Sequence, residues 1–329
     1  MPTVHFILRR FAQLVLLLLL VTAATSLLSS LIPGDFFAAQ ELDPTISRET
    51  LQQLRRQHGL DQPALIQYAG WLRNLLRLDL GYSLFYRAPV AAVLFSALQR
   101  TLWLAVPALL IGTIGGVLLG TLHATWRGRP AGLILDVLST ILLSLPSLLL
   151  GLGAMLLASR TGWFPLGSMN APTQEGASSL PWLIDRLHHL ILPVACLSVP
   201  ILATIERIQH TAVRQTLDEP YVRSARARGL SAWRIFAAHL LRPSLNNVIS
   251  TSGPLFGAVL SGSLVLEVIF SWPGLGRITY DALFSRDVFL LLGSVMASGV
   301  LLVIANLAAD IVLSRLDPRT RPESGGVVR

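Results

Sequence analysis

The sequence predicts an all-α polytopic membrane protein with six transmembrane helices. Of its 329 residues, 53% are hydrophobic and only 13% are charged, and the mean hydropathy is +0.61. A water-soluble domain of this length needs considerably more charge to cover its surface. Crossing the hydrocarbon core of a bilayer takes about 20 apolar residues in a helix, and six runs are long enough. They lie at residues 11–31, 101–124, 133–158, 190–208, 246–270 and 288–313.

The first run has some features of a secretory signal. Arg9 and Arg10 precede it, and the small residues 22–25 follow its most apolar part. Its apolar character continues through Ile32, which is longer than the apolar core of a typical signal peptide. We therefore expect this run to be retained as the first membrane span.

The distribution of arginine predicts which side of the membrane each segment faces. The chain contains no lysine, so arginine alone carries the positive-inside signal. Arginines precede the first run, follow the sixth, and lie between the second and third and between the fourth and fifth runs. The loop at residues 34–100 holds seven, but loops longer than about 60 residues cross largely regardless of charge. Both termini are therefore predicted to be cytoplasmic, and the net charge of +8 requires no nucleic-acid partner.

The long loop at residues 34–100 is predicted to form a small extracytoplasmic cap. Ser47 can cap a helix that contains Leu51, and residues 62–78 place apolar side chains at helical spacing. The loop at residues 160–189 is rich in glycine and proline, so it should be irregular, with its last residues along the membrane interface. Because no soluble domain or clear repeat is found, residues 1–329 are predicted to form one membrane domain.

Glycines and ionisable residues mark particular positions in the runs. The second run carries glycines at near-helical spacing, which favours close helix packing over an open translocation path: Gly112, Gly115, Gly116 and Gly120. The ionisable residues in or beside the runs are Asp136, Glu206, Arg207, Glu267 and Asp310. All lie within about two helical turns of a predicted interface, so we interpret them as interfacial charges that pair with arginine or reach the headgroups. A proton or ion relay would instead need such groups near the midplane of the bilayer.

The sequence lacks the motifs of a hydrolytic or redox enzyme. No GxxxxGK[ST] phosphate loop, HExxH or GxSxG motif is present. His188 and His189 are adjacent, so they point in different directions on a helix and make a poor metal pair. Cys196 is the only cysteine, which excludes an intrachain disulfide and a cysteine cluster. The chain is therefore predicted not to be an enzyme, and energy for any transport must come from another protein.

The segment at residues 218–243, DEPYVRSARARGLSAWRIFAAHLLRP, has the signals of a short ordered helix between the fourth and fifth runs. Asp218 can cap this helix, and Pro220 lies in its opening turn. Gly229 is placed to end it, with Leu230 folding back as the apolar residue beyond the glycine. Loops between membrane spans seldom contain so many residues that start or end a helix.

A second helix is predicted to follow the glycine. Ser231 can start this helix, its apolar residues give it a surface to bury, and Pro243 would close it. The resulting helix–turn–helix would protrude from the membrane, which favours a docking element for another protein. The alternative is a basic loop adsorbed on anionic lipid headgroups.

The residues of this helix–turn–helix resemble a known family. Residues 221–243 are similar to the cytoplasmic coupling loop of permease subunits in the dipeptide, oligopeptide and nickel branch of ABC importers. In the general loop pattern a glutamate is followed by two alanines and, six positions after the glutamate, by a glycine. Here Arg223 stands at the glutamate position, Ala225 keeps the second alanine, and Gly229 is the glycine. The arginine looks like the variant found in the peptide branch.

Other stretches extend the resemblance over nearly the whole chain. They are LDLGYSL at residues 78–84, HLILPVACL at 189–197, EVIFSWPGLGR at 267–277 and LDPRTR at 316–321. Together with the arginine pair before the first run and the long first loop, they look like the first of the two permease subunits in this family. The detail of the first loop and the absence of lysine depart from the pattern and leave the solute open.

The resemblance implies the type I permease fold of an ABC importer, as a multi-pass protein of the bacterial plasma (inner) membrane. It implies a second homologous permease, two ATP-binding cassette ATPases and an extracytoplasmic solute-binding protein as partners. ATP and Mg²⁺ would be bound by the ATPases, so no cofactor or catalytic residue is expected in this chain. The loop at residues 209–245 would couple it to the ATPases through Tyr221, Arg223, Ala225, Arg226, Arg228, Gly229 and Leu230.

Import of short peptides, delivered by the binding protein, is the function that the resemblance favours. Nickel, a metal chelate or another peptide-like solute would fit the same architecture. An ion-coupled secondary transporter working alone is an alternative of a different class, and it would need a buried carboxylate such as Asp136, Glu267 or Asp310. A membrane-embedded enzyme is a further alternative, which turnover of a substrate without partner subunits would support. The residues that line a solute path are not identified by the sequence.

Overall fold

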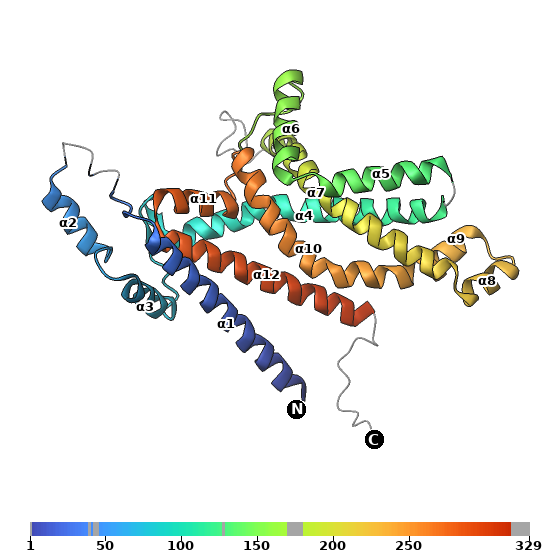
Figure 1. The fold of residues 1–329 in the computed structure, drawn as a ribbon, viewed down its shortest axis with the longest axis horizontal. Coiled ribbons are helices and arrows are strands. Elements are labelled where there is room, and N and C mark those ends of the chain that lie inside the picture. The colour runs from blue at the N-terminus through green and yellow to red at the C-terminus, as the bar shows by residue number, and fades with distance from the viewer. Residues whose placement is uncertain (1, 39–40, 42–45, 127–128, 170–179, 317–329) are drawn as a thin grey trace. The chain divides into compact units, whose positions relative to one another are not determined.

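The computed structural model describes residues 2–38, 41, 46–126, 129–169 and 180–316, and most of these residues are helical (Figure 1). The chain divides into two compact units at three points. Two of these divisions fall inside the long helices α4 (Val90–Thr125) and α12 (Val288–Leu316), and the third lies between residues 272 and 273. Unit 1 comprises residues 1–101 and 273–303, and unit 2 comprises residues 102–272 and 304–329.

Unit 1 combines the first helix with the segment predicted to form a cap. Besides the first part of α4 and most of α12, its elements are α1 (Pro2–Leu31), α2 (Arg48–Gln57), α3 (Ala64–Leu75), β1 (Tyr82–Ser83), β2 (Ala88–Pro89) and α11 (Leu275–Ser285). α3 packs along α1, where the Tyr68 hydroxyl donates a hydrogen bond of 2.9 Å to the Leu19 carbonyl (Figure 1). The unit's apolar core joins α4, α11 and α12 through Val90, Leu94, Ala97, Leu275, Ile278 and Leu290.

The two helices predicted in the cap are present. The Ser47 hydroxyl accepts a hydrogen bond of 3.1 Å from the Thr50 amide, which caps α2 as expected. The antiparallel hairpin of β1 and β2 was not predicted. Its strands are two residues long, so no alternating pattern marks them. Buried Asp287 ties this hairpin to α12, since its carboxylate accepts bonds from the Ser83 hydroxyl at 2.7 Å and the Leu290 amide at 3.2 Å.

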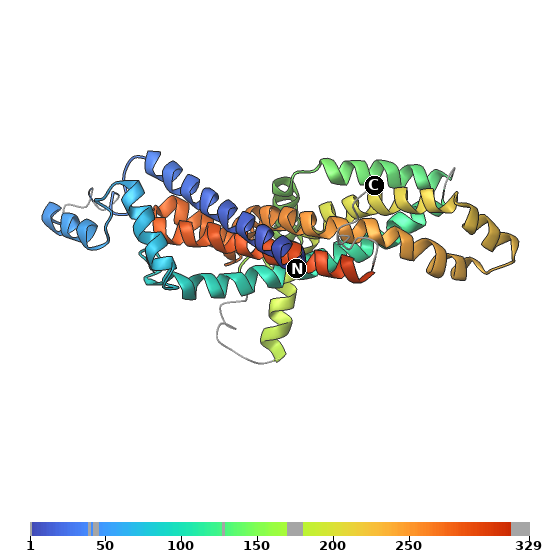
Figure 2. The ribbon, with the colours of Figure 1, turned by 90° about the horizontal axis from the view of Figure 1, so that it is seen from below.

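Unit 2 is a bundle of helices in which α7 makes the most contacts. Besides the second part of α4 and the end of α12, it contains α5 (Pro130–Ser144), α6 (Ser147–Thr161), α7 (Leu180–Leu217), α8 (Pro220–Ala227), α9 (Ala232–Ile235), a π-helical segment (Phe236–Leu241) and α10 (Arg242–Ile269). α7 packs against α5, α6 and α10, and α10 runs beside it in both views (Figures 1 and 2). The core is apolar and includes Leu104, Ile201, Ile205, Leu266, Phe270 and Trp272.

All six predicted runs fall on helices. Within the described residues, α1, α4, α7 and α12 are each long and apolar enough to span a membrane. The number of candidate spans rises from four to six if each of two bent helix pairs counts as one span. These pairs are α5 with α6, bent by 99°, and the two parts of α10, bent by 45°. The predicted run at residues 133–158 is therefore divided into two helices, because Pro146 disfavours helical geometry at Leu145, whose ψ is 118°.

Helix boundaries differ from the prediction at two other places. α4 begins at Val90, well before the predicted start of the second run, because its first turns pack in the core of unit 1. α7 begins at Leu180, so the end of the loop predicted to be irregular is helical. Residues 170–179 of that loop lie outside the described residues.

The glycines of α4 pack closely against α7, as predicted. A Cβ atom on Gly116 would lie 2.7 Å from the Ile205 Cβ and 2.8 Å from the Leu202 carbonyl oxygen. A Cβ atom on Gly112 would likewise lie 2.7 Å from the Ile201 Cβ. These distances are too short for a side chain, so the missing Cβ atoms set how closely α4 and α7 approach. Gly153 of α6, by contrast, has no such neighbour within 4 Å.

This difference predicts opposite effects for the same substitution. Gly116→Ala should lower the free energy of unfolding by about 1–3 kcal/mol, because the backbone of α7 must move to admit the methyl group. Gly153→Ala should be neutral or stabilising by up to about 1 kcal/mol, since alanine favours helix. Thermal unfolding of both purified variants in detergent would test the prediction, and equal shifts would contradict it.

Candidate functional site

The hairpin formed by α8 and α9 continues from the ends of α7 and α10 (Figures 1 and 2). α8 starts differently from the prediction: its N-cap is Glu219, which makes no side-chain capping bond, and not Asp218. Pro220 explains the difference. It occupies the first helical position, where its missing amide is harmless, and it holds the preceding residue extended, with Glu219 at φ −69° and ψ 141°.

α8 ends as the sequence predicts. Gly229 has a φ of +75°, in the left-handed region that glycine adopts without strain. Its amide donates to the Arg226 carbonyl at 2.9 Å, and the Leu230 amide donates to the Ala225 carbonyl at 3.3 Å. These two bonds form a Schellman motif, which satisfies the last carbonyls of the helix and reverses the chain.

The second arm of the hairpin differs from the prediction at its end. Ser231 does start it, since its hydroxyl accepts from the Arg234 amide at 3.4 Å. Pro243 does not close it. α9 passes into the π-helical segment Phe236–Leu241 and directly into α10, in which Pro243 lies in the first turn. Proline is tolerated at that position, and the wider π-helical turns before it accommodate the change, so the arm is continuous with α10.

The interior of the hairpin is a small apolar core. Val222 and Ala225 of α8 are fully buried against Ile235 and Leu240 of the second arm, and Leu230 packs on the edge of this cluster. Ala225 is one of the expected coupling residues, and its small buried side chain lets the two arms of the hairpin approach each other. Among the expected coupling residues, the exposed ones are Tyr221, Arg223, Arg226, Arg228 and Gly229.

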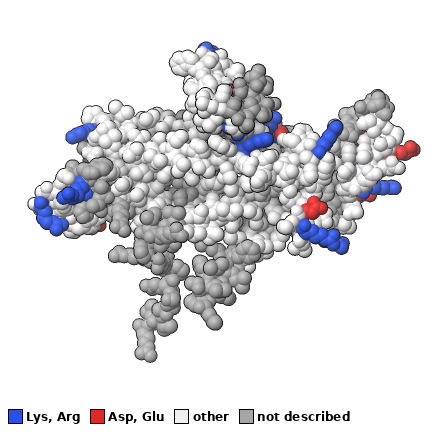
Figure 3. Space-filling view, turned by 180° about the vertical axis from the view of Figure 1, so that it is seen from behind, with Lys and Arg blue, Asp and Glu red and all other residues white. Residues whose placement is uncertain are grey.

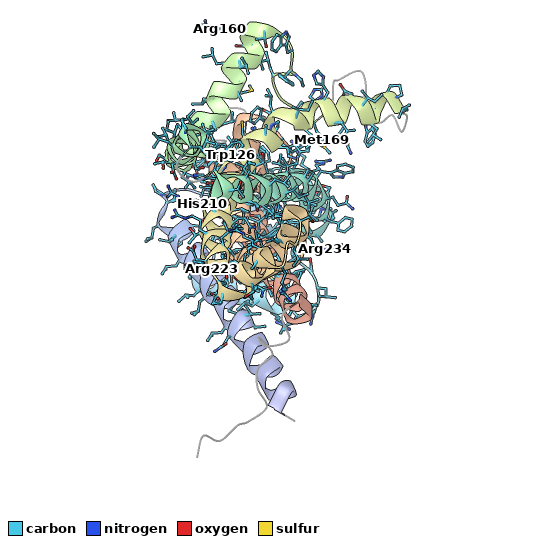
Figure 4. The ribbon with its side chains drawn as sticks, turned by 90° about the vertical axis from the view of Figure 1, so that its right-hand side faces the viewer. Trp126, Arg160, Met169, His210, Arg223 and Arg234 are labelled. Atoms are coloured by element: carbon cyan, nitrogen blue, oxygen red, sulfur yellow. The ribbon has the colours of Figure 1, made fainter. Side chains whose placement is uncertain are left out.

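The exposed surface of the hairpin is basic. Figure 3 shows arginine side chains at the end of unit 2 that carries α8 and α9. In Figure 4, which faces this end, Arg223 of α8 and Arg234 of α9 lie on different sides of the hairpin. Neither forms an ion pair with a carboxylate among the described residues. Both guanidinium groups are therefore available to an acidic partner surface.

An open apolar groove lies beside these arginines. It has a volume of about 640 Å³ and is lined by Thr125 at the end of α4, by Arg226 of α8 and by apolar residues of the hairpin. Tyr221 is 43% exposed, and partial burial, followed by the charge of Glu219, raises the pKa of its hydroxyl. The hydroxyl is therefore neutral at pH 7. The surface combines cations, a neutral hydroxyl and apolar contact, as protein-docking surfaces commonly do.

A buried polar network lies below the hairpin and was not predicted. The Glu206 carboxylate of α7 is 3% exposed and lies 2.6 Å from both His123 Nδ1 of α4 and the Ser139 hydroxyl of α5. One turn further along α7, the Gln209 amide donates to the Thr121 hydroxyl at 3.1 Å and to the Ser244 hydroxyl of α10 at 2.8 Å. The network therefore joins α4, α5 and α10 to α7.

Glu206 was interpreted as an interfacial charge, and that interpretation is wrong. Its carboxylate is bonded to a histidine and a serine inside the bundle and not to arginine or solvent. Glu267 is also fully buried, whereas the side chain of Asp310 lies outside the described residues. The spacing of Glu206 and Gln209, three residues apart on one helical face, was the available signal for a polar contact between helices.

Comparison with known proteins shows to which family the chain belongs. The family model described as "Binding-protein-dependent transport system inner membrane component" matches residues 112–322, and the N-terminal model of the same systems matches residues 3–105. The chain belongs to this family. It is therefore a multi-pass inner-membrane transport component without an ATPase site of its own, which confirms the predicted class and excludes a membrane enzyme or a carrier working alone.

Individual relatives of this inner membrane component match over nearly their full length. A peptide transport system permease protein of Brucella abortus (strain 2308) is 34% identical and covers 96% of this chain and 98% of the relative. The oligopeptide transport system permease protein AppB of Bacillus subtilis (strain 168) is 33% identical, covering 95% and 98%. The glutathione transport system permease protein GsiC of Salmonella choleraesuis (strain SC-B67) is 30% identical, covering 96% and 99%.

A solved structure supports the fold of this component. A chain of the MetNI methionine ABC transporter, in an inward-facing conformation, superposes with a TM-score of 0.55 at 15% identity. The match covers 69% of this chain and 97% of that one. The type I permease fold is thereby confirmed. Family membership also implies that the component works with an ATPase and a binding protein.

Proposed function

We propose that this chain is one of two permease subunits that form the path for short peptides in an ATP-driven importer. The observation that carries this proposal is its full-length similarity, at 33–34% identity, to permeases of peptide and oligopeptide transport systems. The partners are a second homologous permease, two ATP-binding cassette ATPases that bind ATP and Mg²⁺, and an extracytoplasmic solute-binding protein. The chain itself supplies the conduit.

The hairpin of α8 and α9 is the ATPase-coupling element in this proposal. Residues 209–245 and both termini are cytoplasmic, residues 34–100 form the extracytoplasmic cap, and the whole chain acts as one membrane domain. Arg223, Arg226 and Arg228 make charged contacts with the ATPase. Two features support this role: the basic surface of the hairpin and the absence of a flexible joint between its second arm and α10.

Motion of an ATPase would reach the membrane through the helices that flank the hairpin. The first arm packs on the end of α7, and the second arm continues into α10. The hydrogen bond from Gln209 to Ser244 links α7 and α10 directly below the hairpin. A displacement of the hairpin therefore tilts both helices together, which is how closure of the ATPases opens or shuts the path. By linkage, the corresponding states of permease and ATPases must stabilise each other.

Uptake by reconstituted complexes tests this function. Vesicles that contain this chain with its partner subunits should accumulate a labelled tripeptide only when both ATP and the binding protein are supplied. Vesicles that lack this chain should accumulate none. Peptide accumulation driven by an ion gradient, without ATP, would contradict the proposal.

A peptide-like solute other than a simple peptide is the second candidate. The similarity to a glutathione transport permease, at 30% identity over 96% of this chain, favours it. Nickel or a metal chelate remains a prediction from the sequence alone. Competition of unlabelled glutathione or a nickel chelate with the labelled tripeptide would separate these solutes in the same vesicles.

A further inference from the structure

A polar pocket in unit 1 has no part in the transport function described above. It has a volume of about 420 Å³ and lies where the C-terminal end of α1, the cap and the start of α12 meet. Its polar lining includes Ser26, Ser29, Ser30, Arg55, Gln67 and Arg286. Ser26, Ser29 and Ser30 follow one another on a single face of α1, so three hydroxyl groups lie together on one wall.

Of the two arginines in the pocket, Arg286 forms no ion pair with a carboxylate of the described residues. Arg55 is neutralised, because its Nε and Nη2 bind Asp35 at 2.5 and 2.9 Å and its Nη2 also lies 2.6 Å from Glu41. Burial acts to raise the pKa of Asp35, but the bonds from Arg55 outweigh it and lower the pKa, so this pair stays ionised. Arg286 makes no ion pair with any described carboxylate. Its neighbour Asp287 is bonded to Ser83 instead.

The backbone holds the Arg286 guanidinium group in the pocket. Gly34 has a φ of +91°, and a Cβ atom at this position would collide with Nη1 of Arg286. The missing side chain of Gly34 thus makes room for the guanidinium group. Arg286 itself has a φ of +58°, which residues other than glycine rarely adopt. Arg286 is the C-terminal cap of α11, where the Asp287 amide donates to the Ala282 carbonyl at 2.9 Å, so the position of the cation is built into the fold.

The pocket also lies at the depth where two membrane spans end. The apolar span of α1 ends at Leu31 and that of α12 begins at Val288, and the pocket is lined by Ile32 and Val288. Lipid headgroups occupy this level of a bilayer. On the membrane side of the pocket, on the same face of α1 as Ser26, Val15 and Leu19 are 38% and 37% exposed, so acyl chains can pack against them.

We propose that this pocket binds the phosphate of an anionic phospholipid with a phosphatidylglycerol headgroup. The Arg286 guanidinium group would bind two phosphate oxygens side by side, and the hydroxyls of Ser26 and Ser29 would donate to the others. The Gln67 amide nitrogen donates to the Leu60 and Gln62 carbonyls, so its side-chain oxygen and the Asp35 carboxylate can accept from the glycerol hydroxyls. Inorganic phosphate presents the same oxygens, but it lacks the acyl chains that Val15 and Leu19 of α1 would hold.

Native mass spectrometry of the complete transporter, titrated with phosphatidylglycerol, tests this site. Arg286→Asn should raise the Kd for the lipid about tenfold or more, the effect expected from losing a charge-assisted bond. Asparagine suits the left-handed backbone, so the variant should fold. Arg87→Asn is the matched control, because Arg87 is exposed, has a φ of +50° and lies outside the pocket.

Three results would overturn the proposal. The first is wild-type protein that binds phosphatidylglycerol no better than zwitterionic phosphatidylethanolamine. The second is equal binding by Arg286→Asn and Arg87→Asn. The third is displacement of the lipid by millimolar inorganic phosphate, which would identify a free anion as the ligand. The proposal is supported if the wild type and Arg87→Asn bind phosphatidylglycerol, Arg286→Asn does not, and inorganic phosphate does not displace the lipid.

Discussion

Gly229→Asp should reduce solute uptake at least tenfold while leaving the permease inserted and the ATPases active. Aspartate tolerates the left-handed backbone at φ +75°, and nothing lies within 4 Å of the position of its Cβ atom, so the hairpin itself should fold. The new side chain would instead project from the docking surface. Its charge would pair with the adjacent Arg228 and repel an acidic partner, which would separate ATP hydrolysis from transport.

Two variants separate the possible causes of this effect. Gly229→Asn has nearly the same shape without the charge, and it should retain most of the uptake. Gly162→Asp places the same charge at another open, left-handed helix end, with φ +66°, and should leave transport intact. Uptake and ATP hydrolysis would be measured on the same vesicles. Normal uptake by Gly229→Asp would count against a docking role, and equal loss by Gly229→Asn would exclude charge as the reason.

Glu206→Leu should lower the free energy of unfolding by about 2–4 kcal/mol. The substitution leaves His123 and Ser139 buried without their partner, and each unsatisfied polar group costs about 1–3 kcal/mol. Glu206→Gln keeps one acceptor oxygen and should cost less. The melting temperature of the purified complex in detergent reports the difference.

Two controls make this prediction specific to the network. Asp136→Asn alters a largely exposed carboxylate 3.5 Å from the same histidine and should change stability by less than about 0.5 kcal/mol. Combining Glu206→Leu with His123→Leu and Ser139→Ala removes every partner and should restore part of the loss. If the triple variant melts lower than Glu206→Leu alone, the bonds are not the source of the effect.

Features that depend on neighbouring residues in the sequence were predictable. The apolar runs, the Ser47 cap and the glycine that ends α8 depend on hydrophobicity and backbone geometry within a few residues. The extent of the break at Leu145 and the continuation through Pro243 were not predicted, for a related reason. Each proline acts according to its exact place in a helix turn, and hydropathy does not report that place.

Contacts between distant residues were not predictable. His123 and Glu206 are 83 residues apart, and only the packing of α4 on α7 brings them together. The same holds for the burial of Ala225, which depends on the second arm folding back over α8. The sequence predicted that the hairpin is a docking site. Which of its residues are buried and which are exposed follows from tertiary structure.

Site-specific crosslinking tests the central claim, that the hairpin of α8 and α9 is where the ATPase docks. The only native cysteine, Cys196, is buried, so a single introduced cysteine can be followed without background. In the assembled complex, Arg226→Cys should crosslink to an ATP-hydrolysing subunit, with a yield that changes when ATP binds. Arg87→Cys, exposed in the cap, should not. Crosslinking of the ATPase to position 87, or labelling of position 226 from outside intact cells, would contradict the account.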